Sequence, residues 1–106
     1  MIKIRWSQAA VKDLQALVEY LDADGSDAAD QLLVQFKKSV CRLHDFPELG
    51  GIVPEFRDIG LPLYRELIVA RYRVIYCLKD KVAMIIALID QRQNVDDVLM
   101  NRLMQS

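Results

Sequence analysis

Hydrophobic and polar residues alternate along several segments of this chain, and each alternation has the period of one kind of secondary structure. Residues 2–6 alternate apolar and charged side chains, which predicts a β-strand with one covered face. Residues 8–23, and the segment from Ser26 to Pro47, repeat apolar side chains at helical spacing, which predicts two amphipathic helices. Because very few residues separate these helices, we expect them to pack as an antiparallel hairpin.

The ends of both predicted helices carry residues that suit them. Ser7 is a natural N-cap for the first helix, and Gly25 fits its left-handed end. The second helix is expected to begin at Ser26 and to end at Pro47. Five residues at helical spacing form its expected buried stripe: Ala29, Leu33, Phe36, Val40 and Leu43.

The second half of the chain is rich in β-forming residues. Residues 48–54 read as a loop, and a short extended piece is expected at 55–59. Residues 63–70 and 71–78 are predicted strands, and the second of them places alternate side chains on opposite faces. Residues 82–89 contain no polar side chain, so we expect an interior strand covered on both faces.

A polar hairpin turn at Lys79–Lys81 and a second turn at Gly60–Pro62 are expected between these strands. Asn94 is a candidate N-cap for a short C-terminal helix. The resulting order of elements predicts an α+β fold, with an N-terminal strand and an antiparallel helical hairpin packed on a mostly antiparallel sheet. At 106 residues, of which 53% are hydrophobic, residues 1–106 are expected to form a single domain.

Charge is unevenly distributed along the chain, although the formal net charge is only −1. Residues 7–30 carry six acidic side chains and one basic one, whereas residues 57–92 carry seven basic and four acidic ones. A net charge of −1 argues against a protein whose whole surface binds nucleic acid, but it leaves room for a local positive patch. The candidate target-binding residues are four arginines of the second half: Arg65, Arg71, Arg73 and Arg92.

Five short stretches, in this order and at this spacing, resemble one known family. They are Trp6–Leu14, Phe46–Gly50, Tyr64–Leu67, Tyr72–Tyr76 and Ile89–Arg92. Together they are similar to the RelE/ParE toxins of bacterial type II toxin–antitoxin modules. The resemblance spans nearly the whole chain, and it implies a cytoplasmic toxin that a cognate antitoxin, ParD-like or similar, neutralises in a hetero-oligomeric complex.

The resemblance offers two activities, because RelE-like members cleave messenger RNA on the ribosome and ParE-like members inhibit DNA gyrase. Arg73 and Arg92 match the two arginines of the RelE-like site, and Arg65 falls where a lysine is often found. A further lysine position is apolar here, at Leu67 or a neighbouring residue, and the tyrosine position falls on Val98. Because the residues for proton transfer are missing, the resemblance favours the ParE-like branch, an inhibitor rather than an enzyme.

The ParE-like branch often has a histidine where this chain has Asp90, so the match departs from the pattern there. Two alternatives therefore stay open. One is a ribosome-dependent messenger RNA endonuclease, in which Arg65, Arg73 and Arg92 bind or stabilise phosphate. The other is a degenerate member that has lost toxicity and only binds its antitoxin.

The same arginines also admit structural interpretations. Arg73 has Glu66 and Asp90 as possible cross-strand partners, Arg65 has the adjacent Glu66, and Arg92 suits a solvated position. The tyrosines of the second predicted strand are expected in the core. The apolar run 82–89 requires a cover on the second face of the sheet, either from the tail helix with a homodimer or from an antitoxin.

The remaining reactive residue types indicate no catalytic or metal site. Cys41 and Cys77 are expected to be small buried apolar groups in a reducing compartment. His44, the single histidine, is expected at the negative end of the second helix. We expect no cofactor, no metal and no membrane segment.

Overall fold

One sheet and two pairs of helices make up the fold of this protein. The computed structural model describes residues 1–23, 25, 27–58 and 63–104. Within them, five strands form one sheet in the order β1-β5-β4-β3-β2: β1 (Lys3–Trp6), β2 (Gly51–Ile52), β3 (Tyr64–Val69), β4 (Tyr72–Lys79) and β5 (Val82–Asp90). The helices are α1 (Gln8–Asp22), α2 (Ala28–Cys41), α3 (Pro54–Arg57) and α4 (Val95–Met104), with a 3-10 turn η1 at Arg42–His44.

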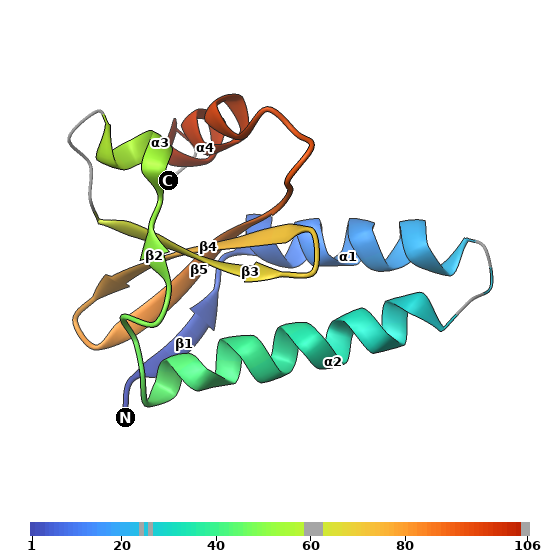
Figure 1. Ribbon diagram of the computed structural model, residues 1–106, viewed down its shortest axis with the longest axis horizontal. Helices are drawn as coiled ribbons and strands as arrows, with labels where there is room; N and C mark the ends of the chain where they lie inside the picture. The colour runs from blue at the N-terminus through green and yellow to red at the C-terminus, as the bar shows by residue number, and fades with distance from the viewer. Residues whose placement is uncertain (24, 26, 59–62, 105–106) are drawn as a thin grey trace.

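The sheet is antiparallel except at one edge, where β1 runs parallel to β5 with Lys3 opposite Val82. Helices α1 and α2 form a hairpin on one face of the sheet, and α3 and α4 lie on the other (Figure 1). The predicted α+β fold with a helical hairpin on a mostly antiparallel sheet is therefore confirmed. Among the described residues, none of the helices has the length and apolar character needed to cross a membrane.

Local signals explain most of the helix ends. The Ala10 amide donates to the Ser7 hydroxyl at 3.0 Å, which is the predicted N-cap of α1. Gly25 adopts a φ of 72° just beyond α1, as expected of a glycine in the left-handed region. The expected start of the second helix at Ser26 lies outside the described residues, and α2 is helical from Ala28.

Two details of the second helix differ from the prediction. It ends at Cys41 and continues as the 3-10 turn η1, well before Pro47. Within its stripe, Leu32 is buried and Leu33 is only half-buried, because the helix is turned slightly toward Leu32. The other four residues of the predicted stripe are buried as expected.

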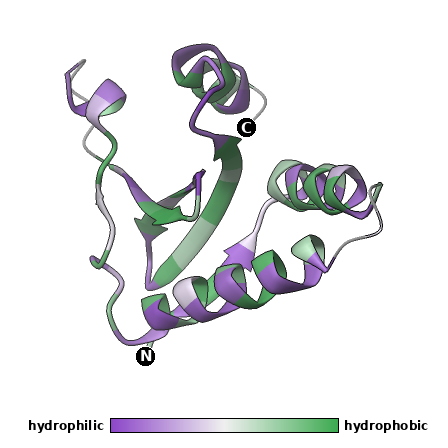
Figure 2. Ribbon diagram, turned by 45° about the vertical axis from the view of Figure 1, so that its right-hand side comes forward, coloured by the Kyte–Doolittle hydropathy of each residue, from purple (hydrophilic) through white to green (hydrophobic). Residues whose placement is uncertain are grey.

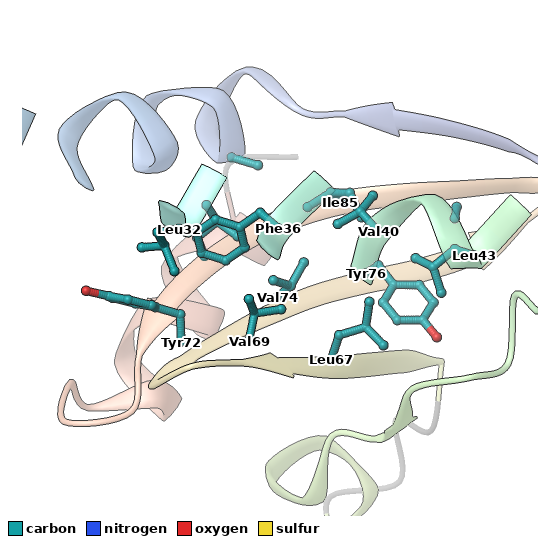
Figure 3. Packing of buried hydrophobic residues seen from close by; sticks show 13 residues of the cluster. Leu32, Phe36, Val40, Leu43, Leu67, Val69, Tyr72, Val74, Tyr76 and Ile85 are labelled. Carbon is teal, nitrogen blue, oxygen red and sulfur yellow. The ribbon is translucent and has the colours of Figure 1, made fainter. Parts of the chain in front are cut away.

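The larger core lies between the helical hairpin and the sheet (Figure 3). Phe36 of α2 and Tyr72 of β4 pack with ring centroids 6.0 Å apart. Tyr76 is fully buried, and its hydroxyl donates to the Pro47 carbonyl oxygen at 2.8 Å. The prediction that Tyr72 and Tyr76 belong to the core is confirmed.

A smaller core lies on the second face, where α3 and α4 pack on β4 and β5. Val53, Phe56, Ile75, Ile89 and Leu99 are its largest buried members. Strand β5 supplies both cores, and it is apolar for most of its length (Figure 2). This confirms the prediction of an interior strand. Its cover on the second face is only partial, because Ala87 and Ile89 are buried whereas Met84 and Ile86 are half-buried.

A β-bulge in β5 shifts the alternation of its side chains. Ile75 pairs with Ala87 while the next residue, Tyr76, pairs with Ile85, so Ile86 has no partner in register. As a result Ile86 and Ala87 both contribute to the second core although they are neighbours in sequence.

The segment between α2 and β3 corrects two expectations. Residues 54–57 form the helix α3, so the extended piece expected at 55–59 is wrong; Pro54 begins this helix, and its fixed φ favours that position. Gly51 and Ile52 form the edge strand β2 instead of a loop. Gly50 must be glycine, because a Cβ there would lie 2.5 Å from the Glu66 carbonyl oxygen.

Other expectations concern single residues. Cys41 is exposed on α2, so its predicted burial is wrong, and Cys77 is half-buried on β4. His44 lies in η1, where its ring Nδ1 donates to the Ile2 carbonyl oxygen at 2.7 Å. The turn expected at Gly60–Pro62 lies outside the described residues.

Candidate functional site

The four candidate arginines occupy three different places. Arg73 lies on the second face of the sheet, under α3, with its side chain 11% exposed. Arg65 lies on the opposite face, beside the segment that precedes β2. Arg71 and Arg92 lie together at the end of β5, where the Arg92 side chain is 70% exposed. The structure thus brings two of the four together and separates the others.

Arg73 is enclosed by two carboxylates. Its Nη1 and Nη2 donate to the two carboxylate oxygens of Glu55 at 2.8 and 2.9 Å, and its Nε donates to Glu66 Oε2 at 2.6 Å. The cross-strand pairing of Arg73 with Glu66 that the sequence suggested is confirmed, whereas pairing with Asp90 is wrong. Glu55 lies on α3. Because residues 55–59 were predicted to be extended, the sequence analysis did not identify Glu55 as a partner of Arg73.

The charges of this cluster stabilise one another. The hydrogen bonds from Arg73 lower the pKa of Glu55, against the opposing effect of burial. The hydrogen bonds of Arg73 to Glu55, together with those to Glu66, raise the pKa of Arg73 above its ordinary value, although desolvation opposes this shift. The Arg73 guanidinium is hydrogen-bonded to carboxylates on both of its edges. Because one of these carboxylates, Glu55, lies on α3, Arg73 holds α3 on the sheet.

Arg65 binds the main chain rather than its neighbour Glu66. Its Nη1 donates to the carbonyl oxygen of Gly50 at 2.7 Å and to that of Glu48 at 3.3 Å. The suggested Arg65–Glu66 pair is therefore wrong, since neighbouring residues in a strand point to opposite faces. Arg65 positions the segment that leads into β2.

Arg71 and Arg92 converge on Asp90. The Arg92 side chain donates from Nη2 and Nε to Asp90 at 3.0 and 3.2 Å, and Arg71 Nε lies 3.6 Å from Asp90 Oδ2. The hydrogen bonds from Arg92 lower the pKa of Asp90 to about 2. Two cations and one carboxylate leave this cluster with one positive charge in excess.

Main-chain geometry fixes Arg71 beside the end of β5. The turn between β3 and β4 consists of Ala70 and Arg71, and Ala70 adopts a φ of 54°. The Gln91 amide donates to the Arg71 carbonyl oxygen at 2.9 Å, which ties this turn to the segment after β5. The guanidinium of Arg71 lies 5.6 Å from the centroid of the Tyr72 ring.

An open groove of about 690 Å³ runs from these arginines between α1 and α4. Tyr20 of α1 and the hydroxyl of Tyr72 contribute to it, and Arg71 Nε donates to that hydroxyl at 3.4 Å. The sequence reading found no proton-transfer side chain beside the arginines, and it missed these two tyrosines. Tyr20 is 68% exposed, so its hydroxyl is accessible to a partner.

The groove ends at an ion pair that sequence reasoning also missed. Arg102 of α4 donates to Asp13 of α1 at 2.8 and 3.1 Å, and it also donates to the Ile86 carbonyl oxygen. Asp13 accepts the Leu88 amide at 3.0 Å. The Asp13–Arg102 pair thus provides hydrogen-bond partners for the Leu88 amide and the Ile86 carbonyl oxygen, main-chain groups of β5 that lie beyond its pairing with β1. A signal existed, because Asp13 falls within the apolar stripe of its helix.

Within the described residues, no group of three or more histidine, cysteine, aspartate or glutamate side chains is placed to hold a metal ion. The candidate site is therefore a surface of paired arginines and tyrosines. Such a surface can bind an anion or a carboxylate-bearing protein surface, since a guanidinium presents several donors in one plane.

Comparisons with known proteins agree with this fold. A family model, the ParE toxin of the type II toxin–antitoxin system parDE, matches residues 4–95. Among solved structures, a chain of the chromosomal ParDE toxin–antitoxin system from P. aeruginosa is similar, with a TM-score of 0.69 and 19% identity. That likeness covers 85% of this chain and 96% of the other, and at this identity it shows the fold. A comparison with curated proteins gives no match.

Proposed function

The chain belongs to the ParE toxin family of type II toxin–antitoxin systems, and from this membership we propose that it inhibits DNA gyrase and is neutralised by a cognate antitoxin. The observation that carries the proposal is the family match over residues 4–95, which contains the helical hairpin and all of the sheet except its first residue, Lys3. We further propose that residues 1–106 form one toxin domain that acts in the cytoplasm, where gyrase works.

We propose that gyrase is contacted through the exposed cluster of Arg71 and Arg92. These two guanidinium groups lie at the surface with one positive charge in excess, whereas Arg73 and Arg65 are engaged inside the fold. An exposed charge pair contributes little to folding and is free to act in recognition. The site would therefore bind its target without a covalent step.

A supercoiling assay with purified gyrase and relaxed plasmid tests this proposal. The wild-type protein is expected to inhibit supercoiling or to trap gyrase–DNA cleavage complexes. The double variant Arg71→Ala/Arg92→Ala is expected to lose at least roughly tenfold in potency, which corresponds to about 1.4 kcal/mol of binding free energy. The matched control is Lys37→Ala/Lys38→Ala, which removes two exposed cations from α2 and should retain potency.

One observation favours the messenger RNA endonuclease as a second candidate. Tyr20 and Tyr72 lie in the same groove as Arg71 and Arg92, so hydroxyl groups stand near cations there. Cleavage of messages on programmed ribosomes, abolished in Tyr20→Phe, would replace the gyrase proposal. If strong expression without an antitoxin leaves growth unaffected, the chain is a degenerate member that only binds its antitoxin.

A further inference from the structure

The groove between α1 and α4 has the size and the closed end of a small-molecule site. Its volume is about 690 Å³, within the usual range for such sites. Arg71 and Arg92 stand at one end of it, and the Asp13–Arg102 ion pair lies at the other. We call the space between these two ends the α1–α4 groove.

The arginine end of the α1–α4 groove offers hydrogen-bond donors to an anion. Arg71 and Arg92 share one carboxylate, that of Asp90, and their side chains remain 48% and 70% exposed. A guanidinium has five N–H donors, and the bonds to Asp90 and to the Tyr72 hydroxyl use only some of them. Two exposed guanidinium groups with one positive charge in excess suit a phosphate group.

Two tyrosines stand beside this cationic end. The hydrogen bond to Asp90 is the main cause of the raised pKa of Arg92. Tyr20 and Tyr72 make smaller contributions to it, so both lie close enough to act on this guanidinium. Tyr72 is buried and belongs to the core, whereas Tyr20 is 68% exposed on α1. An aromatic ring that is exposed in a groove is a surface on which a nucleobase stacks.

The middle of the α1–α4 groove is apolar. Leu17 of α1, Leu88 of β5 and Val98 of α4 line it, and Leu17 and Val98 are only half-buried. Asn101 of α4 also lines the groove and is exposed, and its amide both donates and accepts hydrogen bonds. Such a lining suits a flat heterocycle, because a nucleobase has apolar faces and polar edges.

We propose that the α1–α4 groove binds a free nucleotide, with its phosphates on Arg71 and Arg92 and its base stacked on Tyr20. The ligand is a single nucleotide rather than a strand, because the unbalanced cations are gathered at one end of the groove. A strand needs cations that follow its backbone. At the other end, Arg102 is already engaged with Asp13.

The α1–α4 groove is distinct from the RNA-cleaving site that the family resemblance suggested. Of the three arginines aligned with that site, Arg92 lines the groove, whereas Arg65 is bound to main-chain carbonyl oxygens and Arg73 to carboxylates. The inference does not depend on gyrase being the target, because nucleotide binding is a property of the isolated chain.

An NMR titration of the whole chain with ADP, GDP, CDP and UDP tests the proposal. At least one of the four is expected to bind with a dissociation constant below roughly 1 mM and to shift the methyl signals of Leu17, Leu88 and Val98. Adenosine or the matching nucleoside lacks the phosphates, and pyrophosphate lacks the base. Each of these two is expected to bind at least about tenfold more weakly than the nucleotide, because each keeps half of the contacts.

Substitutions at the two ends of the ligand sharpen the test. Arg92→Ala should weaken binding of the nucleotide at least about tenfold, and its matched control Lys38→Ala, on α2, should not. Tyr20→Leu should weaken it at least about fivefold, whereas Tyr20→Phe keeps the ring and should bind within about twofold of wild type. Phe46→Leu, at an aromatic position 63% exposed elsewhere, is the control for loss of a ring.

Three outcomes would overturn the proposal. The first is the absence of shifts at Leu17, Leu88 and Val98 with all four nucleotides at roughly 1 mM. The second is pyrophosphate that binds as tightly as the nucleotide, which would leave an anion site without base recognition. The third is a single-stranded oligonucleotide of about eight residues that binds the groove more tightly than any nucleotide, which would assign it to a strand. A failure of gyrase inhibition alters none of these readouts, so the two proposals can fail separately.

Discussion

The two faces of the sheet are covered by different kinds of interaction. On the first face, the α1–α2 hairpin buries a continuous apolar core that contains Phe36 and Tyr76. On the second face, α3 is tied down by Arg73 and Glu55, and α4 by Arg102 and Asp13, each pair supplementing a smaller apolar core.

The two kinds of interaction respond differently to changes in the protein and in its solvent. Apolar burial on the first face is unconditional, and it is worth roughly 25 cal/mol for each Å² removed from water. Ion pairs depend on pH and on both partners being present. The second face also carries an open groove, so a molecule bound there would leave the apolar core under the hairpin intact.

The largest expected effect follows from opening a cavity in the first face. Phe36→Ala removes a ring that is 2% exposed and packed against Tyr72, so it should lower the free energy of unfolding by about 3–5 kcal/mol. Urea unfolding followed by circular dichroism measures the change. Val34→Ala, at a position 53% exposed on the same helix, should cost less than about 0.5 kcal/mol.

Removing the central cation of the second face should have the next largest effect. Arg73→Ala leaves Glu55 and Glu66 facing each other without a counter-charge, and it should cost roughly 3 kcal/mol. In a double-mutant cycle, Arg73→Ala and Glu55→Ala should cost less together than the sum of the single changes. Additive costs would show that the pair does not hold α3.

A smaller effect is expected at the other ion pair. Asp13→Asn weakens the contacts with Arg102 and with the Leu88 amide, and it should cost about 1–2 kcal/mol. Hydrogen exchange at the Leu88 amide should become faster, and this readout separates loss of the edge contact from a general loss of stability. Glu19→Gln, at an exposed position of α1, is the control.

The smallest expected effect is a pH dependence on the second face. Because the pKa of Glu55 is lowered from its ordinary 4.5 in the folded state, its contribution is complete above that value and is lost as pH falls through the lowered one. The difference in urea midpoint between wild type and Glu55→Gln should therefore be clear near pH 7 and shrink by about pH 3. An equal difference at both pH values would contradict this role.

Sequence patterns predicted the elements that are long and periodic. The alternation in residues 71–78 identified β4, and the stripe around Phe36 identified α2. They failed for short elements, because β2 exists only through its pairing with β3, and the four residues of α3 are too few to show a period. The exposure of Cys41 was missed because it depends on which face of α2 meets the sheet.

The candidate site was predictable only in part. Arg71, Arg73 and Arg92 were found because cations are conspicuous among β-forming residues. Which of them is buried depends on the register of β3 against β4 and on the carboxylate that α3 brings from outside the sheet. The Asp13–Arg102 pair joins residues 89 positions apart, a contact that no local pattern specifies.

The parallel pairing of β1 with β5 has a consequence for protein synthesis. Residues 3–6 are made before their partners at 82–85, and the whole segment between them must be synthesised in the interval. Long-range pairing of this kind is slow, because the loop between the strands must close first. A nascent chain interrupted before Val82 therefore lacks the strand that joins its first residues to the sheet, along with Asp90 and Arg92. The sheet, and the cluster of Arg71, Asp90 and Arg92 beside it, can therefore form only after synthesis has passed Arg92.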